Sequence, residues 1–161
     1  MDQNKQTYFV YHTPLGRITL ASDGNALTQL VFGAADLSGT NKSTALTNRA
    51  STEILEYLAG KRTSFDLPLN PRGTDFQHSV WKALRSIPYG QTRTYGEVAA
   101  MIGNPRSGRA VGGANNKNPL PILIPCHRVI GVNGNLVGYA AGLHIKRFLL
   151  DLEAKYASRQ V

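Results

Sequence analysis

The chain has 161 residues, only one of which is cysteine, and few charged side chains. A single cysteine excludes an intramolecular disulfide, and no second cysteine or histidine cluster completes a zinc site. No segment has the run of about 18 apolar residues that a membrane helix needs, and the first residues lack the basic-then-apolar pattern of a secretory signal. A composition of 42% hydrophobic and 17% charged residues is typical of folded domains. We therefore expect a globular, intracellular protein with no metal and no membrane span.

Negative charge is scarce in the second part of the chain. Residues 1–70 carry six Lys and Arg against six Asp and Glu, whereas residues 71–161 carry twelve against four, so the net charge of +8 lies wholly in the second part. A basic surface attracts polyanions, of which nucleic acid is the commonest, and arginine, which forms most of the excess, suits phosphate geometry. A general excess of solvated basic side chains is the alternative.

The first part of the chain predicts a small domain with strands and one helix. Short β-rich runs within residues 7–32 are separated by turns, as in an antiparallel meander. Residues 43–60 have a helical pattern. The apolar positions at helical spacing are Leu46, Ala50, Ile54, Leu55 and Leu58. A segment rich in Pro follows and predicts a strand that runs into a linker, so the expected domains are 1–71 and 72–161.

The second part predicts mainly helices. The segments from Thr74 to Gln77 and from Thr94 to Glu97 each match a capping box. The second box begins a short helix, and a Gly/Pro turn separates it from another short helix within residues 106–118. This pair lies in the most basic segment and resembles a helix-turn-helix, although many helical hairpins bind nothing. We therefore expect an α+β protein: a small N-terminal antiparallel sheet plus helix, then a mainly helical domain with a winged-helix-like helix-turn-helix.

A final helix is expected from about His144 to Tyr156. Its apolar stripe consists of Ile145, Phe148, Leu149 and Leu152. Glu153 falls at the edge of this stripe, where a carboxylate either stays solvated or turns inward to a buried partner. Helical spacing leaves both options open.

The only thiol lies in the sequence Ile-Pro-Cys-His-Arg-Val, after an apolar approach, which predicts a sheltered position. A free thiol has a pKa of about 8.5, so a nucleophilic Cys126 needs a base or a cation nearby. His127 is adjacent in sequence, but neighbouring side chains often diverge. The dipeptide alone therefore leaves a buried structural cysteine as the alternative.

The wider sequence resembles the O6-alkylguanine-DNA alkyltransferases. The resemblance rests on "GTDFQHSVWKALRSIPYGQTRTYGEVA", "RAVGGANNKNPLPILIPCHRVIG" and "GNLVGYAAGLHIKRFLLDLE", and it covers residues 73–153 closely. The N-terminal part agrees more loosely, in the order of its elements. The resemblance implies direct-reversal repair: a single-turnover, irreversible transfer of the alkyl group from O6-alkylguanine in duplex DNA to the protein's own cysteine after base flipping. O4-alkylthymine is a further candidate substrate.

The resemblance also implies catalytic roles for four residues. Cys126 is the expected nucleophile, His127 its base through a water, and Glu153 the carboxylate that orients the histidine, as in nucleophile–base–carboxylate triads. Asn118 is expected to brace the turn between the DNA-reading helix and the cysteine.

Further residues match the family's DNA-binding and base-binding positions. Arg109 is expected to fill the gap left by the flipped base and Tyr95 to rotate the target phosphate outward. A phosphate-binding arginine and a core tyrosine are the plainer alternatives. The other expected DNA-binding residues are Ala110, Gly112, Gly113 and Arg128. The expected base pocket contains Tyr139, Val129, Ala140 and Ala141.

The expected partner is double-stranded DNA that contains alkylated guanine, bound without a cofactor by a monomer, with cooperative binding as an option. The expected location is the cytoplasm, with the nucleoid, or the nucleus in a eukaryote. Three rival functions remain: a protein that flags lesions without repairing them, a helix-turn-helix regulator, and a Cys-His hydrolase. The reactive cysteine argues against the first, the Cys-His-Glu set against the second, and the basic helices against the third.

Overall fold

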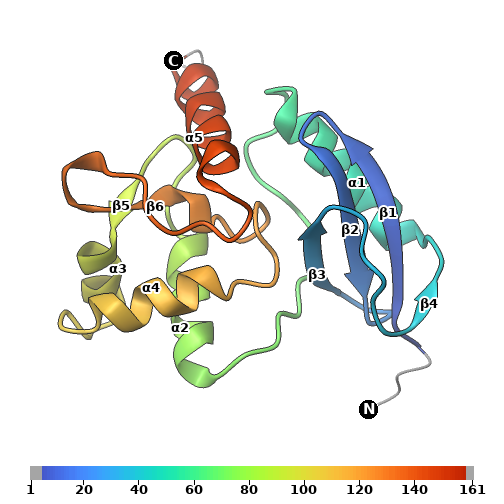
Figure 1. Cartoon of the computed structure of the whole chain (residues 1–161), viewed down its shortest axis with the longest axis horizontal. Coiled ribbons are helices and arrows are strands. Elements are labelled where there is room, and N and C mark those ends of the chain that lie inside the picture. Colours follow the sequence, from blue (N-terminus) through green and yellow to red (C-terminus); the bar gives the residue numbers. More distant parts are fainter. Residues whose placement is uncertain (1–4, 159–161) are drawn as a thin grey trace. The chain divides into compact units, whose positions relative to one another are not determined.

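The computed structural model describes residues 5–158. The backbone forms two compact units, the first ending at Arg72 and the second beginning at Gly73 (Figure 1). Within residues 5–158, no helix is long and apolar enough to cross a membrane.

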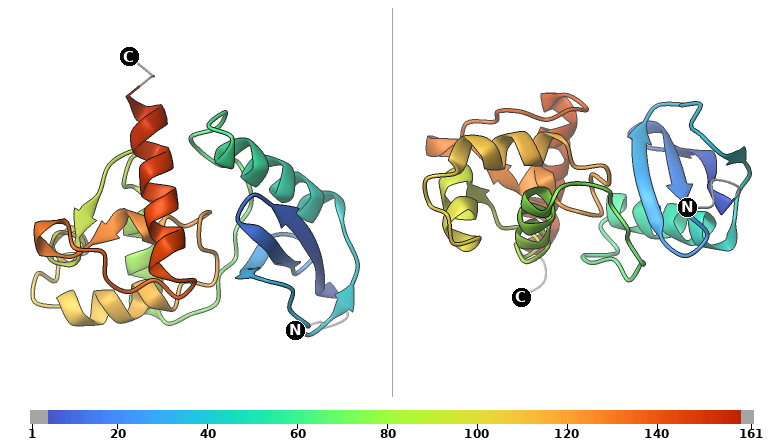
Figure 2. Two further views of the ribbon diagram at one scale, coloured as in Figure 1. Left: turned by 45° about the horizontal axis from the view of Figure 1, so that its top comes forward. Right: turned by 90° about the horizontal axis from the view of Figure 1, so that it is seen from below.

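The first unit is a four-stranded sheet with one helix. The strands are β1 (Thr7–Thr13), β2 (Gly16–Ser22), β3 (Leu27–Phe32) and β4 (Thr40–Asn41). Their order in the sheet is β3-β2-β1-β4, with β1, β2 and β3 antiparallel, so the predicted meander is confirmed. β4 was not predicted, and it pairs with β1 in parallel. Helix α1 (Ala45–Leu58) lies across one face of the sheet and contacts β1 and β2 (Figure 2).

The predicted apolar face of α1 is partly wrong. Ala50, Ile54 and Leu58 are buried, but Leu55 is 40% exposed. At 100° per residue, Leu55 lies about 100° from the middle of the face that the other three define. The predicted strand after α1 is also wrong, because its only ladder contact is a single bridge from Leu69 to β3. The preceding Pro68 lacks the N–H group that a longer ladder would use.

The second unit is mainly helical. Its helices are α2 (Asp75–Arg85), α3 (Tyr95–Met101), α4 (Gly108–Asn116) and α5 (Leu143–Ala157), and its two short strands are β5 (Arg93–Thr94) and β6 (Val129–Ile130). The predicted α+β class is thus confirmed. Both predicted capping boxes are present, at Thr74 and Thr94. α2, α3 and α4 contact one another, and the buried Trp81 on α2 donates a hydrogen bond of 2.9 Å to the carbonyl of Ala114 on α4. The two helices of the helix-turn-helix, α3 and α4, therefore rest on α2.

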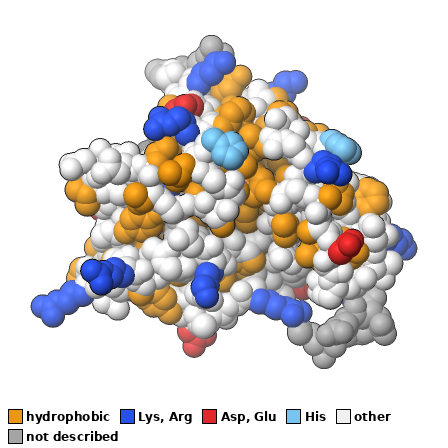
Figure 3. Space-filling view, in the orientation of Figure 1, with side chains coloured by type: hydrophobic (Ala, Val, Ile, Leu, Met, Phe, Trp, Pro, Cys, Tyr) orange, Lys and Arg blue, Asp and Glu red, His pale blue; other side chains and the backbone are white. Residues whose placement is uncertain are grey.

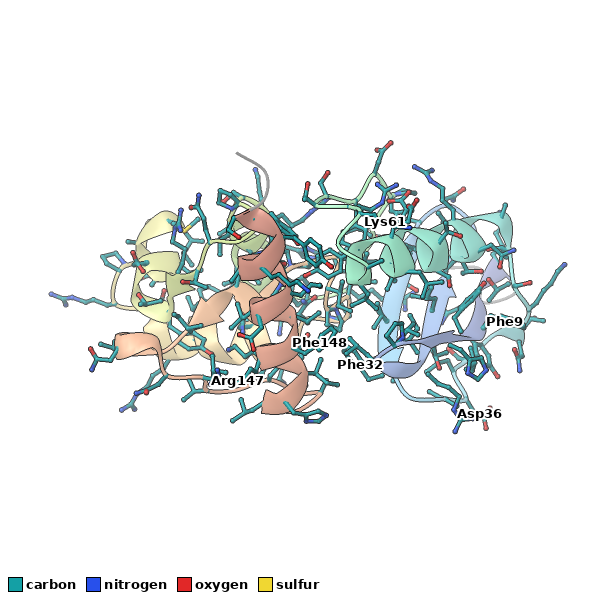
Figure 4. The ribbon with its side chains drawn as sticks, turned by 90° about the horizontal axis from the view of Figure 1, so that it is seen from above. Phe9, Phe32, Asp36, Lys61, Arg147 and Phe148 are labelled. Carbon is teal, nitrogen blue, oxygen red and sulfur yellow. The ribbon has the colours of Figure 1, made fainter. Side chains whose placement is uncertain are left out.

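The predicted apolar face of α5 is wrong at one position. Ile145, Leu149 and Leu152 are buried as predicted, whereas Phe148 is 41% exposed (labelled in Figure 4). Lys146 and Glu153 are buried too, and Phe148 lies about 100° from the middle of the face that these five buried residues define. Two charged side chains of α5 therefore point inward, while the aromatic ring is exposed.

Candidate active site

The thiol of Cys126 is enclosed by the second unit. Cys126 begins a short 3₁₀ helix, Cys126–Arg128, directly before β6, and it is only 4% exposed, so the predicted sheltered position is confirmed. Burial raises the pKa of this thiol to about 11, although hydrogen bonding with Asn118, the charge of Lys146 and a hydrogen bond with Tyr139 act in the opposite direction. The thiol is therefore protonated at neutral pH and needs a base at the moment of attack.

Asn118 holds the turn that leads to the cysteine. Its Nδ2 donates to the carbonyl of Ile124 at 2.8 Å, and its Oδ1 accepts from the N–H of Leu120 at 2.9 Å. Inside this turn, Ile122 is buried with a φ of 73°, in the left-handed region that a β-branched residue rarely adopts. The asparagine side chain thus stabilises a costly backbone conformation two residues before Ile124 and four before the thiol.

A buried carboxylate lies beside the histidine of the motif. The Nε2 of His127 donates to Oε2 of Glu153 at 2.7 Å, and both side chains are almost wholly buried. Arg128 donates to the same carboxylate twice, from Nε to Oε1 at 2.8 Å and from Nη2 to Oε2 at 2.9 Å. The N–H of Gly90 adds a further bond to Oε1 at 3.1 Å. The carboxylate that spacing left at the helix edge is turned inward and has four donors.

Gly90 is a position that only glycine fits. Its φ is +79°, and an added Cβ would lie 2.5 Å from the Cβ of Ala157 on α5. The loop after α2 therefore passes close enough to α5 to donate its N–H to Glu153. Sequence reasoning missed this contact.

These contacts set the protonation states of the pair. Burial alone would raise the pKa of Glu153, but the hydrogen bonds and charges of His127 and Arg128 outweigh it and hold that pKa far below its usual range. Burial lowers the pKa of His127, against the opposing pull of Glu153. The site therefore holds an ionised carboxylate beside a neutral imidazole. Because Nε2 donates to Glu153, Nδ1 carries the lone pair, and any proton from Cys126 has to reach the ring there.

Arg128, which was predicted to contact DNA, lies inside the second unit. Its side chain is buried, and in addition to its two bonds to Glu153 its Nη1 donates to the carbonyl of Ile87 at 2.7 Å. The guanidinium also lies over the ring of Tyr89, 5.8 Å from the centroid. A phosphate cannot replace these partners without unpairing a buried carboxylate. The ion pair was not predicted, because nothing nearby in the sequence marks Glu153 as the partner of Arg128.

The predicted base-pocket residues differ in exposure. Val129 is buried, Tyr139 and Ala141 are half-buried, and Ala140 is exposed. Burial raises the pKa of the Tyr139 hydroxyl, so it stays protonated and can donate.

The segment just before Tyr139 is held from two sides. The carbonyl of Val137 accepts one hydrogen bond from the hydroxyl of Tyr95 on α3 and another from Nζ of Lys146 on α5, both at 2.9 Å. Tyr95, expected at the DNA, thus also contacts the base-pocket segment.

The predicted DNA-reading residues of α4 lie on its outer side. Arg109, Ala110 and Gly113 are exposed and Gly112 is half-buried. An added Cβ at Gly112 would meet the ring of Tyr95 at 3.8 Å, an ordinary contact, and one at Gly113 would meet nothing within 4 Å. Packing within the chain therefore accommodates alanine at both positions, although glycine costs helix stability there.

The basic surface of the second unit is smaller than its sequence charge indicates. Arg128 and Lys146 are buried. The exposed basic residues within residues 73–158 are Lys82, Arg85, Arg106, Arg109, Lys117, Arg147 and Lys155. Basic side chains are spread over the face of the molecule in Figure 3, where acidic ones are few. No group of three His, Cys, Asp or Glu side chains that could hold a metal ion occurs in the part of the chain that the structure describes.

Comparison with known protein families gives two matches. Residues 7–71 match the family described as 6-O-methylguanine DNA methyltransferase, ribonuclease-like domain. Residues 75–155 match the family described as 6-O-methylguanine DNA methyltransferase, DNA binding domain. The two matches together span both units.

Similar proteins match along nearly their whole length. The methylated-DNA–protein-cysteine methyltransferase of Methanosarcina acetivorans is 50% identical over 155 residues, covering 91% of this chain and 97% of its own. The constitutive methylated-DNA–protein-cysteine methyltransferase of Bacillus subtilis is 43% identical, covering 91% and 94%. A crystal structure of Mycobacterium tuberculosis OGT in complex with DNA is similar at 46% identity and a TM-score of 0.87, covering 93% of this chain and 94% of that one.

Proposed function

Because the chain belongs to the 6-O-methylguanine DNA methyltransferase family, we propose that it repairs alkylated DNA by moving the alkyl group from O6 of guanine to Cys126. The observation that carries the proposal is the buried pair of His127 and Glu153, joined at 2.7 Å, directly after the buried thiol. A nucleophile that is protonated at neutral pH needs such an oriented base. The names of the relatives and the DNA-bound OGT structure support the same activity.

The geometry suggests the following reaction. The thiol proton of Cys126 passes to Nδ1 of His127 through a water, while Glu153 stabilises the imidazolium that forms. The sulfur attacks the alkyl carbon, and the S–C bond forms as the C–O bond breaks. Guanine is the leaving group, its O6 is freed from the alkyl group, and one proton returns to that oxygen. The product thioether has no hydrolytic exit, so each molecule acts once.

Flipping the base is assigned to the helix-turn-helix. The target oxygen lies inside the duplex, so the nucleotide has to leave the stack, at lower cost for a poorly paired alkylguanine. Arg109 projects from the outer side of α4, as a residue that fills the gap would need to. For Tyr95 to act on the phosphate, its hydroxyl has to leave the carbonyl of Val137.

We further propose that the protein acts as a monomer where the DNA lies: in the cytoplasm at the nucleoid, or in the nucleus of a eukaryote. Supporting this, each residue assigned to the reaction lies within one unit of one chain, between Tyr95 and Glu153.

The test is to mix the protein with a duplex that contains O6-methylguanine and to weigh the intact protein. We expect a gain of one methyl group, mapped to the Cys126 peptide, and no gain with an undamaged duplex or with Cys126→Ala. An unmodified protein that still binds the lesion would indicate a flag or a regulator. Product formation beyond one equivalent would indicate a hydrolase.

The flipping step has its own test. Arg109→Ala should slow transfer from duplex DNA but leave the reaction with free O6-alkylguanine unchanged, because the free base needs no flipping. Equal losses on both substrates would contradict this role.

A further inference from the structure

The loop after α2 makes a tight turn beside the buried carboxylate of Glu153. The N–H of Gln91 donates to the carbonyl of Pro88 at 3.1 Å, and Gly90, the third residue of this turn, has a φ of +79°. Tyr89, the second residue, has a negative φ. Among the β-turns that close with this hydrogen bond, type II combines a negative φ at the second residue with a positive φ at the third. This turn is therefore of type II.

The type of turn decides which backbone atom faces the carboxylate. In a type II turn, the peptide between the second and third residues is turned over relative to the commoner type I turn. Here that peptide joins Tyr89 to Gly90, and its N–H donates to Oε1 of Glu153 at 3.1 Å. A type I turn, which residues other than glycine favour here, would direct the carbonyl of Tyr89 to that side. Glycine at position 90 thus gives the carboxylate a donor instead of an acceptor.

The N–H of Gly90 completes a set of four donors around the carboxylate of Glu153. Oε1 accepts from Gly90 and from Nε of Arg128. Oε2 accepts from Nε2 of His127 and from Nη2 of Arg128. Each oxygen thus has two donors. Hydrogen bonds to a carboxylate stabilise its charged form, so the loss of one donor makes the group more basic and increases its attraction for a proton on the histidine.

The loop that carries the turn contacts the cysteine motif at two further points. Before the turn, the carbonyl of Ile87 accepts from Nη1 of Arg128 at 2.7 Å. After the turn, β5 pairs with β6, with Arg93 opposite Val129. The turn is therefore held on both sides against residues of the motif, which fixes the N–H that it presents to the carboxylate.

Building on the proposed function, we propose that Gly90 is a positioning residue for alkyl transfer, whose N–H fixes the carboxylate of Glu153 and thereby the strength and orientation of His127 as the base. With all four donors in place, the carboxylate orients the neutral imidazole without drawing a proton from solvent onto it. Without the N–H of Gly90, the imidazole takes up that proton at higher pH and can no longer accept one from the thiol.

The test replaces one atom of the backbone. Glycolic acid incorporated in place of glycine at position 90 changes the N–H to an ester oxygen and keeps the size of the residue. The same replacement at Gly134 is the control, because its φ of +78° is similar and its N–H also closes a turn, onto the carbonyl of Gly131 at 3.1 Å. Single-turnover transfer from free O6-methylguanine, which needs no base flipping, is measured against pH for both variants and for the unchanged protein.

The acid limb of the pH–rate profile reports the pKa of His127, because the protonated ring is not a base. This ring is faced by Glu153 and Lys146 from α5 and by Arg128 from its own segment, and the ester variants alter none of these side chains. We expect the ester at position 90 to raise the pKa of His127. The acid limb should then move to higher pH by on the order of one pH unit, and the rate within it should fall by on the order of tenfold. The ester at position 134 should leave the limb in place.

A signal from the unchanged protein checks the same relationship without a variant. Gly90 and His127 donate to one carboxylate, so the NMR signal of the Gly90 amide proton should shift as the histidine titrates. An amide signal that does not follow this titration would overturn the inference.

The ester variant can contradict the inference in two ways. An acid limb that stays in place would show that the N–H does not act on the base. A uniform loss of rate at every pH would show a merely structural role for the turn. If the unchanged protein transferred no alkyl group even from a methylated duplex, the proposed function itself would be wrong.

Discussion

Arg128 and Glu153 form a bidentate ion pair inside the second unit, with N–O distances of 2.8 and 2.9 Å. His127 and Arg128 together keep the carboxylate ionised although it is buried, and Oε2 of Glu153 accepts the hydrogen bond from Nε2 of His127. Arg128 thus supports the tautomer of the base through the carboxylate. Three consecutive residues of the motif supply the nucleophile, the base and the support for the base.

Replacing the arginine should damage stability more than DNA binding. Arg128→Met removes the positive charge and the hydrogen bonds that stabilise the buried carboxylate of Glu153. Breaking a buried pair in this way costs about 3–5 kcal/mol of the free energy of unfolding. Denaturant unfolding measures the loss. Arg106→Met, at an exposed position, should change stability by less than about 0.5 kcal/mol. A similar small change for Arg128→Met would contradict the structural role of the pair.

The salt dependence of DNA binding should distinguish the exposed Arg109 from the buried Arg128. If Arg109 contacts a phosphate, Arg109→Ala lowers the slope of log K against log salt by about 0.9, because one fewer counterion is released. Arg128→Met should leave that slope unchanged under conditions where it is folded. Anisotropy titrations at several salt concentrations give the slopes. A reduced slope for Arg128→Met would support the predicted contact of Arg128 with DNA.

Gly113 should show opposite effects on stability and binding. Gly113→Ala has space within the chain and should raise the free energy of unfolding by up to about 1 kcal/mol through helix propensity. If α4 lies close to the DNA backbone, the added methyl group should weaken binding to duplex DNA. Unfolding and binding are measured on the same variant. Raised stability with unchanged affinity would indicate that this face of α4 stays clear of DNA.

The pH dependence of stability follows from the pKa of His127. Burial places this pKa below its unfolded value of about 6.5, so between the two values the unfolded chain binds more protons and stability falls as pH falls. The slope is at most about 1.4 kcal/mol per pH unit for one proton. The lowered pKa of Glu153 adds a further loss only below its unfolded value of about 4.3. The free energy of unfolding is measured from pH 5 to 8 for the unchanged protein and for His127→Asn. The contribution of His127 to the pH dependence should be missing in the variant.

Local sequence signals predicted most of the fold. Capping boxes at Thr74 and Thr94 involve atoms three residues apart, and the first three strands alternate with clear turns. β4 has two residues and pairs with β1 across more than thirty positions, so no local pattern marks it.

The site was harder to predict where charge is buried. Apolar periodicity predicted that Phe148 points inward and gave no sign that Lys146 is buried, because the burial of a lysine depends on the carbonyl of Val137, in a distant loop. The same holds for Arg128, whose partner lies 25 residues away. The resemblance identified Cys126 and its neighbours, but the hydrogen bond from Asn115 to the carbonyl of Cys126 could not be found by spacing, because it joins two different elements.

The enclosure of Cys126 also determines how long an idle molecule keeps its function. Peroxides and cellular disulfides attack thiolates far faster than thiols, and they need access to the sulfur. With its pKa near 11 and little exposed surface, this sulfur resists oxidants and foreign electrophiles until a damaged base is delivered to it. For a repair protein used once, such protection preserves the stock of unspent molecules between lesions.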